Sequence, residues 1–388
     1  MRRILMALFA VSVLLWLAAP AIAAPAVTVT VKNSIDIARA SETIVLQATE
    51  LRRLLSVDDV RKVHVRDERS TKDLLVQAVD TNDDGVFEEL IFQADFAPKE
   101  TRKFTLSVGD RQIPRVEDFK AYGRFVQERR DDYAWENDRI AHRMYGAALE
   151  TWPQEPLTSS AVDVWAKRVP QLVINNWYMV DDYHHDHGEG ADFYSAGSTR
   201  GCGGNGIWAG DRVYASANFH GSRTLANGPI RVMFELTYPA WDVAGVRVSE
   251  VKRITLDAGQ NFNRFESHYT IDGAQRELTD AIGIRKGPAP VTTTSREQGS
   301  LRTWETLPGD AGKLGCAVIL DPASLLAFTE DKHNFLITTR VPPNGVITYY
   351  AGFGWNKNGF ATVEDWDRYV AQYAARLRAP LEIKVVAQ

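Results

Sequence analysis

The segment "GPIRVMFELTYPAWDV", residues 228–243, is followed closely by "VRVSEVKRITLDA", residues 246–258, and by "NRFESHYTI", residues 263–271. Each segment carries apolar residues at alternate positions, the pattern of a β-strand that buries one face. Because only short turns separate the three segments, we expect them to pair as neighbouring antiparallel strands. This stretch therefore predicts a large antiparallel sheet near the middle of the chain.

Shorter strand patterns extend in both directions from this sheet. We predict a mainly β fold, with a small N-terminal β-sandwich over residues 25–115 and a large β-sandwich over residues 120–388. The polar segment 109–125, which contains a proline, is the expected connection. Residues 362–378 predict a C-terminal helix, because a Thr-x-x-Asp capping box precedes an apolar helical face.

The chain begins with the features of a secretory signal peptide, which we predict over residues 1–23. Two arginines precede an apolar run that ends in Ala21-Ile22-Ala23, a cleavage site of the A-x-A type. The run is short for a membrane anchor, and no later stretch is apolar enough to cross a bilayer. We therefore expect the mature protein in the periplasm or outside the cell, without a membrane span.

The formal net charge of −5 becomes −7 when the two signal arginines are lost. The mature chain has no basic tract, which argues against nucleic acid as a partner because phosphate binding needs clustered Lys and Arg. The sequence predicts no nucleotide cofactor. Cys202 and Cys316 would either pair in an oxidising compartment or remain separate buried thiols.

Residues 80–90, "DTNDDGVFEEL", have part of the ligand spacing of a calcium loop. Asp80, Asn82 and Asp84 occupy the first, third and fifth positions, and a glycine allows the sharp turn at the sixth. The usual glutamate at the twelfth position is replaced by Ile91. The stretch predicts either a calcium-binding loop between two strands or a solvated hairpin turn.

Charged and aromatic residues crowd the stretch "DDYAWENDRIAHRMYG", residues 131–146. Aromatic rings are uncommon on a purely solvated face, so the stretch predicts part of a ligand site. A surface strand with many salt bridges is the alternative interpretation. The candidate residues are Trp135, Glu136, Asp138 and Arg139 for substrate binding, and His142 and Tyr145 for proton transfer.

The densest group of titratable side chains lies in "YHHDHGEGADFYSAGSTRGCGGNGIW", residues 183–208. Histidine together with carboxylates suits Zn²⁺ or a similar ion, and arginine suits a carboxylate or sulfate. A polar loop whose histidines bond backbone groups is the alternative. The candidate metal ligands are His184, His187, Glu189 and Asp192, and the other candidates are Tyr194 as proton donor, Arg200 as anion clamp and Trp208 as a ring facing sugar.

These two stretches, with "VDVWAKR" at 162–168 and "NGPIRVMFELTY" at 227–238, resemble segments that a family of secreted bacterial proteins shares in the same order. The family has no assigned function, and its members are often found with polysaccharide-degrading enzymes. The resemblance covers most of the mature chain. It implies that the large β-region is a supersandwich of the galactose-mutarotase type, a fold that hosts lyases, mutarotases and hydrolases.

The histidines, tyrosines and arginines of these two stretches favour an enzyme that acts on acidic, uronate-containing oligosaccharides by β-elimination. Removing the proton beside a uronate carboxylate needs a base, an acid for the leaving group and a positive charge. The candidate bases are His142, His184 and His187, the candidate acids are Tyr145 and Tyr194, and the candidate charges are Arg139, Arg200 or a divalent cation, Zn²⁺ or Ca²⁺. Glycoside hydrolysis by paired carboxylates and non-catalytic sugar binding are the alternatives.

Overall fold

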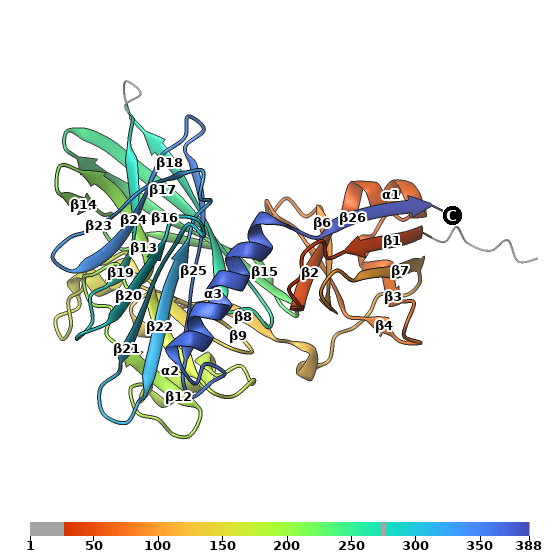
Figure 1. Cartoon of the computed structure of the whole chain (residues 1–388), viewed down its shortest axis with the longest axis horizontal. Coiled ribbons are helices and arrows are strands. Elements are labelled where there is room, and N and C mark those ends of the chain that lie inside the picture. The colour runs from red at the N-terminus through yellow and green to blue at the C-terminus, as the bar shows by residue number, and fades with distance from the viewer. Residues whose placement is uncertain (1–26, 273–276, 388) are drawn as a thin grey trace, which may run out of the picture.

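The computed structural model describes residues 27–272 and 277–387, so the predicted signal peptide lies outside the described part of the chain. Figure 1 shows a small unit and a large unit, both built mostly of strands. The sheets of these units consist of antiparallel strand pairs, and the predicted mainly β fold class is confirmed. Over the same residues, no helix has the length and apolar character needed to cross a membrane.

The small unit is a sandwich of two sheets. Its five-stranded sheet has the order β26-β1-β7-β3-β4, and its three-stranded sheet has the order β2-β6-β5. Alternate apolar side chains of the two sheets bury one another, and helix α1 (Ala48–Leu55) adds Leu51 and Leu55 to this core. The strands are β1 (Val27–Lys32), β2 (Arg39–Gln47), β3 (Val63–Asp67), β4 (Asp73–Leu74), β5 (Val76–Val79), β6 (Glu89–Phe96) and β7 (Thr101–Val108).

The last strand of the chain, β26 (Glu382–Ala387), also belongs to the small unit. It pairs with β1 from Val27 opposite Ala387 to Lys32 opposite Glu382. The sequence division assigned all of residues 120–388 to the large unit, so this boundary differs from the structure. The pairing joins residues about 350 positions apart, and alternation within a single strand carries no signal for so distant a partner.

The large unit contains one eight-stranded sheet and two five-stranded sheets. The eight-stranded sheet has the order β15-β16-β17-β18-β25-β22-β21-β20. It includes the three segments from which the sheet was predicted. Its strands are β15 (Gly221–Asn227), β16 (Arg231–Val243), β17 (Val246–Asp257), β18 (Phe262–Ile271), β20 (Val291–Ser295), β21 (Ser300–Thr306), β22 (Lys313–Ile319) and β25 (Val346–Trp355).

The two five-stranded sheets have the orders β12-β11-β10-β9-β8 and β14-β13-β19-β24-β23. The strands of the first are β8 (Ala121–Val126), β9 (Asp132–Asn137), β10 (Ala141–Met144), β11 (Asp163–Lys167) and β12 (Gly190–Tyr194). The strands of the second are β13 (Cys202–Ala209), β14 (Arg212–Tyr214), β19 (Thr279–Arg285), β23 (Leu325–Glu330) and β24 (Asn334–Arg340).

Both five-stranded sheets pack against the eight-stranded sheet, β8 and β9 against β16, and β13 and β19 against β22. The side chains between them form the main core, in which Phe234, Ile254 and Tyr349 are completely buried. Cys202 and Cys316 lie in this core as free thiols. The large unit is therefore a layered β-sandwich, as expected.

Two helices cover outer faces of this sandwich. Helix α3 (Val363–Arg378) lies on the eight-stranded sheet and buries Trp366 and Val370 (Figure 1). Its capping box is present, so this part of the prediction is confirmed. Helix α2 (Ile174–Val180) packs on the β8–β12 sheet through Trp177, whose ring lies 5.5 Å from that of Trp165. The sequence pattern does not predict helix α2.

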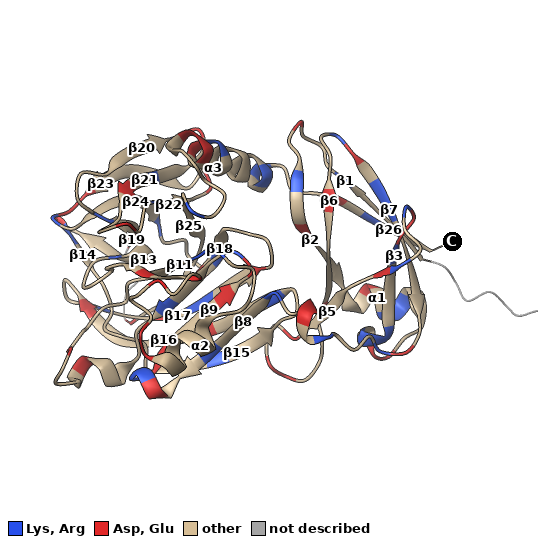
Figure 2. Ribbon diagram, turned by 90° about the horizontal axis from the view of Figure 1, so that it is seen from below, with Lys and Arg blue, Asp and Glu red and all other residues tan. Residues whose placement is uncertain are grey.

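The two units also contact each other directly. Val79 and Ile91 of the small unit pack against Ile230 and Met233 of the large unit. The Gln77 side chain accepts a hydrogen bond from the Ile230 backbone N–H at 2.8 Å. Figure 2 shows basic and acidic residues interspersed over both units. The junction is therefore held by packing and hydrogen bonds as well as by the connecting chain.

Candidate functional site

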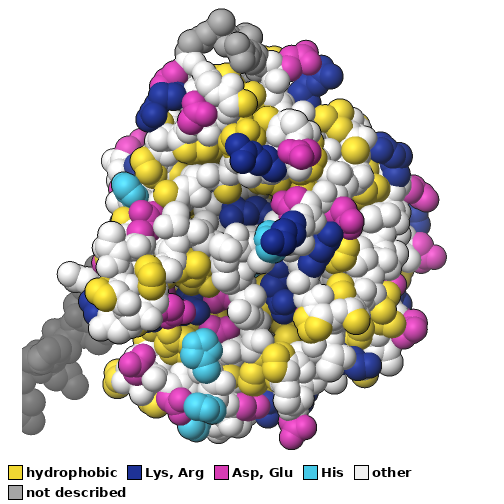
Figure 3. Space-filling model, turned by 90° about the vertical axis from the view of Figure 1, so that its left-hand side faces the viewer, with side chains coloured by type: hydrophobic (Ala, Val, Ile, Leu, Met, Phe, Trp, Pro, Cys, Tyr) yellow, Lys and Arg dark blue, Asp and Glu magenta, His cyan; other side chains and the backbone are white. Residues whose placement is uncertain are grey.

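The histidine-rich segment forms a loop at the edge of the β8–β12 sheet, between α2 and β12. Gly190 ends this loop with a φ of +118°, and a Cβ there would lie 2.0 Å from the backbone oxygen of Ala166. Only glycine fits this conformation and this close approach. The loop is therefore held against β11 while its histidines stay exposed. Figure 3, which views the large unit from the left-hand side of Figure 1, shows a group of histidine side chains near the bottom of the molecule.

The three loop histidines have different partners. His184 Nδ1 lies 3.2 Å from the backbone oxygen of Asp192 and 3.6 Å from its carboxylate. His185 Nδ1 and His187 Nε2 bond to the carboxylate of Asp182, at 2.5 and 2.9 Å. Of the three, His184 is therefore the one that reaches the buried charges beneath the loop.

These buried charges consist of Arg143 of β10 and three aspartates. Arg143 Nε donates to Asp163 at 2.9 Å, its Nη2 donates to Asp192 at 2.8 Å, and its Nη1 lies 3.7 Å from Asp132. Nη1 also donates to the Tyr183 hydroxyl at 3.2 Å. One cation thus gathers carboxyl groups from β9, β11 and β12 at a single place.

The aspartates outnumber the cation, and the pKa values of Asp132 and Asp192 rise. Burial, reinforced by the Asp163 carboxylate, raises the pKa of Asp192 well above its usual range. Burial also raises the pKa of Asp132 to about 7, although Arg143 opposes the shift. Carboxyl groups with raised pKa values hold a proton near neutral pH, which is a property of many acid–base sites.

Two adjoining cavities meet at His184, and we call them the histidine cavities. The smaller, about 240 Å³, is lined by Arg143, Tyr145 and Asp163 among others. The larger, about 550 Å³, includes Lys357 in its wall. His184, Asp192 and Phe193 line both. Ligand pockets commonly measure about 300–1,000 Å³, so the space suits a small organic ligand.

Tyr145 contributes a phenol to the smaller cavity. The Arg143 guanidinium lies over its ring, 5.3 Å from the centroid. Burial, followed by the Asp163 carboxylate, raises the pKa of Tyr145 well above its usual range. The described residues provide no hydrogen-bond partner for its hydroxyl. A protonated phenol is therefore available to a ligand there.

Lys357 contributes a positive charge to the larger cavity. Its Nζ donates to the backbone oxygen of Asp310, and no carboxylate in the described part of the chain pairs with it. An ammonium group has three donors, so two remain for a ligand. His184 thus has a proton donor in one adjoining cavity and an uncompensated cation in the other.

The family model described as a domain of unknown function (DUF4861) matches residues 31–383 of this chain. The chain belongs to the DUF4861 family. It is also 34% identical over 374 residues to the protein named "Uncharacterized protein P7" from Formosa agariphila, a match that covers 92% of this chain and 93% of that protein. The membership agrees with the resemblance to a family of unassigned function.

A solved structure extends the comparison of this DUF4861 chain to more distant proteins. The crystal structure of a protein in the glycosyl hydrolase family 38 from Enterococcus faecalis matches with a TM-score of 0.51 at 9% sequence identity. The match covers 93% of this chain and 47% of that chain, so the DUF4861 chain spans about half of that structure. At this identity the similarity shows the fold alone.

The DUF4861 chain places His142 and Trp135 in its core. His142 Nδ1 bonds to the backbone oxygen of Asp163 at 2.9 Å, and its Nε2 lies 3.0 Å from Asn263 Nδ2. Trp135 stacks on the imidazole with ring centroids 5.1 Å apart. Burial lowers the pKa of His142 to about 4. Both side chains are 0% exposed, so neither meets a dissolved substrate, which corrects their predicted roles.

Glu136, Asp138 and Arg139 connect the β9–β10 turn to neighbouring segments. Glu136 is buried and accepts from Lys167 Nζ at 2.7 Å. Asp138 accepts from the Gly259 backbone N–H at 2.6 Å, and Arg139 Nε donates to Asn261 Oδ1 at 2.6 Å. None of the three lines a histidine cavity. Their observed contacts are structural, in contrast to the predicted substrate contacts.

The candidates after the histidine loop are also separated. Tyr194 lines the smaller cavity, but its hydroxyl donates to the backbone oxygen of Gly201 at 2.9 Å. Arg200 is buried elsewhere and donates to Ser160 Oγ at 2.9 Å. Trp208 is half-buried on β13 and lines neither histidine cavity. Arg139 and Arg200 therefore do not meet the loop histidines in either histidine cavity.

The two predicted metal sites differ in whether their ligand atoms lie close together. Among the described residues, one group of acidic or histidine side chains brings its ligand atoms within 4.8 Å of one another, namely Asp80, Asp84 and Glu88. These oxygens fit a calcium ion, with Glu88 in place of Asn82, and the calcium loop stays a prediction. In the histidine loop, His187 bonds Asp182, and Glu189 accepts from Trp177 Nε1 at 2.9 Å, so the predicted set with His184 and Asp192 does not converge.

Sequence reasoning missed the groups that organise the site. Arg143 belongs to β10 and lies two positions before Tyr145, which directly follows the strand, but no role was predicted for Arg143. Asp132 and Asp163 fall inside stretches already singled out, but nothing local indicated that they meet. Lys357 follows Trp355 in a turn and carries no motif. Lys357 reaches the site because the fold brings its turn beside the histidine loop, which is far away in the sequence.

Proposed function

We propose that this protein is a secreted carbohydrate-active enzyme that cleaves acidic, uronate-containing oligosaccharides by β-elimination in the histidine cavities. The observation that carries the proposal is that His184 lines both cavities, one of which is also lined by Tyr145 and the other by Lys357. These side chains supply a base, an acid and a positive charge. The reaction requires all three.

His184 is the proposed base. The backbone oxygen of Asp192 accepts a hydrogen bond from Nδ1, which leaves the lone pair on Nε2. Its side chain is 63% exposed, so Nε2 can reach a substrate that fills the cavities. Asp192 in turn is fixed by Arg143, whose own position depends on Asp163. Arg143 is therefore a positioning residue.

In the proposed step, His184, Tyr145 and Lys357 account for each proton transferred and for the charge that develops. His184 Nε2 takes the proton beside the substrate carboxylate, and the electrons of that C–H bond form a carbon–carbon double bond. The C–O bond to the leaving sugar breaks, and its oxygen takes the proton of the Tyr145 hydroxyl. The Lys357 ammonium binds the carboxylate and stabilises the charge that develops on it.

One experiment tests the role of His184. We expect the purified protein to convert uronate oligosaccharides to products with the ultraviolet absorbance of an unsaturated uronate. His184→Gln should lower kcat/KM by at least about 100-fold, because a general base commonly contributes about 10²–10⁴. His187→Gln is the matched control, since His187 lies in the same loop, is equally exposed at 63% and lines neither cavity. Equal loss in both variants would contradict the assignment.

Glycoside hydrolysis is the second candidate, and one observation favours it. Asp163 and Asp192 line the same cavity, and the pKa of Asp192 is raised, as in a carboxylic acid that protonates a leaving group. New reducing ends without the absorbance of an unsaturated product would identify hydrolysis. Binding without turnover across a broad panel of substrates would contradict both enzyme proposals.

A further inference from the structure

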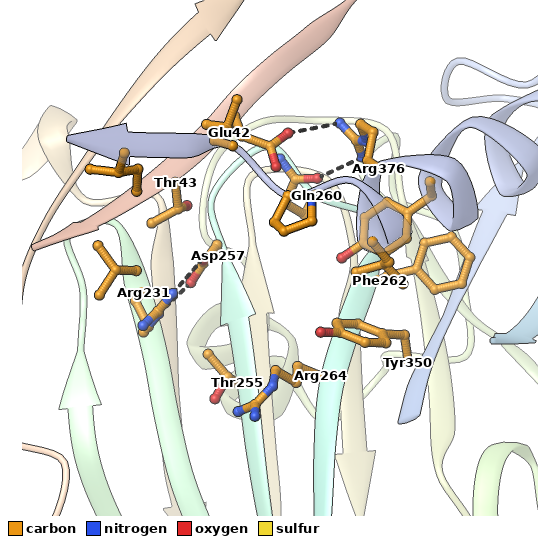
Figure 4. A pocket seen from close by; sticks show the side chains of 16 residues that line it. Glu42, Thr43, Arg231, Thr255, Asp257, Gln260, Phe262, Arg264, Tyr350 and Arg376 are labelled. Atoms are coloured by element: carbon orange, nitrogen blue, oxygen red, sulfur yellow. Dashed lines mark hydrogen bonds and ion pairs between the residues drawn. The ribbon is translucent and has the colours of Figure 1, made fainter. Parts of the chain in front are cut away.

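A third cavity, about 350 Å³, lies where the small unit meets the large unit (Figure 4). We call it the junction cavity. One wall comes from β2 through Glu42 and Thr43, and another comes from helix α3 and the segment that leads to β26. The outer face of the eight-stranded sheet forms the floor. No residue lines both this cavity and a histidine cavity.

Ion pairs build a fixed frame around the junction cavity. Arg231 donates to both carboxylate oxygens of Asp257, at 2.7 and 2.9 Å. Arg376 of α3 donates to Glu42 of the small unit at 3.4 Å and to Gln260 at 3.3 Å. Figure 4 shows these pairs at the rim of the open space. They tie the helix, the sheet and the small unit together, so the cavity is preorganised.

Aromatic rings form the side of the cavity opposite Arg231. Phe262 and Tyr373 stack with ring centroids 4.5 Å apart, and Tyr350 meets Tyr373 edge to face at 5.9 Å. In Figure 4 the Tyr350 side chain points from β25 into the open space. Rings with one apolar face and one polar end suit ligands that are partly apolar and partly wet.

Other polar groups of the lining, two hydroxyls and one guanidinium, have hydrogen-bonding capacity left for a ligand. Thr255 is only 8% exposed, yet its hydroxyl has no hydrogen-bond partner among the described residues, and the same holds for the Tyr373 hydroxyl. Arg264 lies beside Thr255 in Figure 4 and bonds to Glu266 through Nη1. A guanidinium has five N–H donors, so most of those on Arg264 remain free for a ligand.

The charge of the lining limits the ligand further. Three arginines and two carboxylates line the cavity, and both carboxylates are already paired with arginine. The uncommitted groups are hydroxyls, ring faces and the N–H donors of Arg264 that its ion pair with Glu266 leaves free. A sugar matches this set, because its hydroxyls both donate and accept hydrogen bonds while its C–H faces stack on aromatic rings.

We propose that the junction cavity is a second, non-catalytic saccharide-binding site that holds a short stretch of the oligosaccharide chain. The site contains no base that faces an acid, and its role is attachment. Because the lining comes from both units, a bound saccharide bridges them. This inference does not depend on the chemistry at His184.

Binding to the full-length protein tests the proposal. Titration calorimetry with neutral and acidic oligosaccharides, in a His184→Gln background that blocks turnover, should show affinity that depends on the junction. Tyr373→Phe and Arg264→Ala should each weaken it about threefold to tenfold, because one hydrogen bond contributes about 0.5–1.5 kcal/mol. Tyr369→Phe is the matched control, since this hydroxyl of the same helix accepts from the Asn261 backbone N–H outside the lining.

The outcomes separate this site from the histidine cavities. If the junction variants bind normally while Lys357→Ala abolishes binding, the junction proposal is overturned and the proposed function stands. If binding depends on Tyr373 and Arg264 while no substrate is cleaved, the junction site stands and the proposed function fails. Absence of binding to every saccharide tested overturns the junction proposal as well.

Discussion

Asp132 lies fully buried beside Arg143, and its titration should appear in the stability of the whole protein. Burial raises its pKa to about 7, from 3.8 for a free side chain. Between these pH values the folded state keeps a proton that the unfolded state has lost. The free energy of unfolding therefore falls as pH rises from about 4 to about 7.

Asp132→Asn removes this titration while it keeps the shape of the side chain. We expect the unfolding free energy of the variant to decrease less between pH 5 and pH 7.5 than that of the wild type. Urea unfolding at several pH values measures the difference. Asp280, whose pKa burial also raises to about 7, should give a similar effect as Asn and serves as an independent comparison. An unchanged pH profile in Asp132→Asn would show that Asp132 ionises normally.

At the scale of single residues, the sequence indicates the two stretches that form the candidate site but not the role of each side chain. The stretches 131–146 and 183–208 do contribute Arg143, Tyr145 and His184 to one place. The roles within them were misassigned, because residue type and spacing do not reveal burial. His142 looked like a base and is a core residue, whereas Arg143 looked like one charge among many and organises the site.

Among the elements, helix α3 follows most directly from local sequence. The Thr362 hydroxyl accepts from the Asp365 backbone N–H at 3.3 Å, and the Thr362 N–H donates to the Asp365 carboxylate at 3.1 Å. Thr362→Ala should therefore lower the unfolding free energy by about 1 kcal/mol, the usual contribution of an N-cap side chain. Thr362→Ser keeps the hydroxyl and should restore the wild-type value in chemical denaturation. Equal loss in both variants would contradict a capping role.

The strands were predictable as elements but not as sheets. Alternation identified β16, β17 and β18, and short turns fixed them as neighbours. It did not reveal that β25 follows β18 in the same sheet, because that pairing closes a long loop. Helix α2 also escaped prediction, since seven residues with no side-chain cap carry little helical signal.

In the whole molecule, the return of the chain end to the small unit joins the two units a second time. β26 covers the edge of β1, and Val385 packs on the core of the small unit. Removal of residues 381–388 would expose the backbone N–H and C=O groups along β1 and create an open sheet edge. It would also remove Leu381 and Ile383 from the junction cavity.

We therefore expect the truncated protein to unfold in two steps, with the small unit melting first, whereas the full chain unfolds with its units coupled. Differential scanning calorimetry separates the steps, and light scattering detects the association that an open edge favours. Truncation of residues 387–388 alone is the control, because it keeps most of the β1–β26 ladder. A single transition at the wild-type temperature after the longer truncation would mean that β26 contributes little, and that the other contacts between the units, such as Gln77 with Ile230 and Arg376 with Glu42, hold them together.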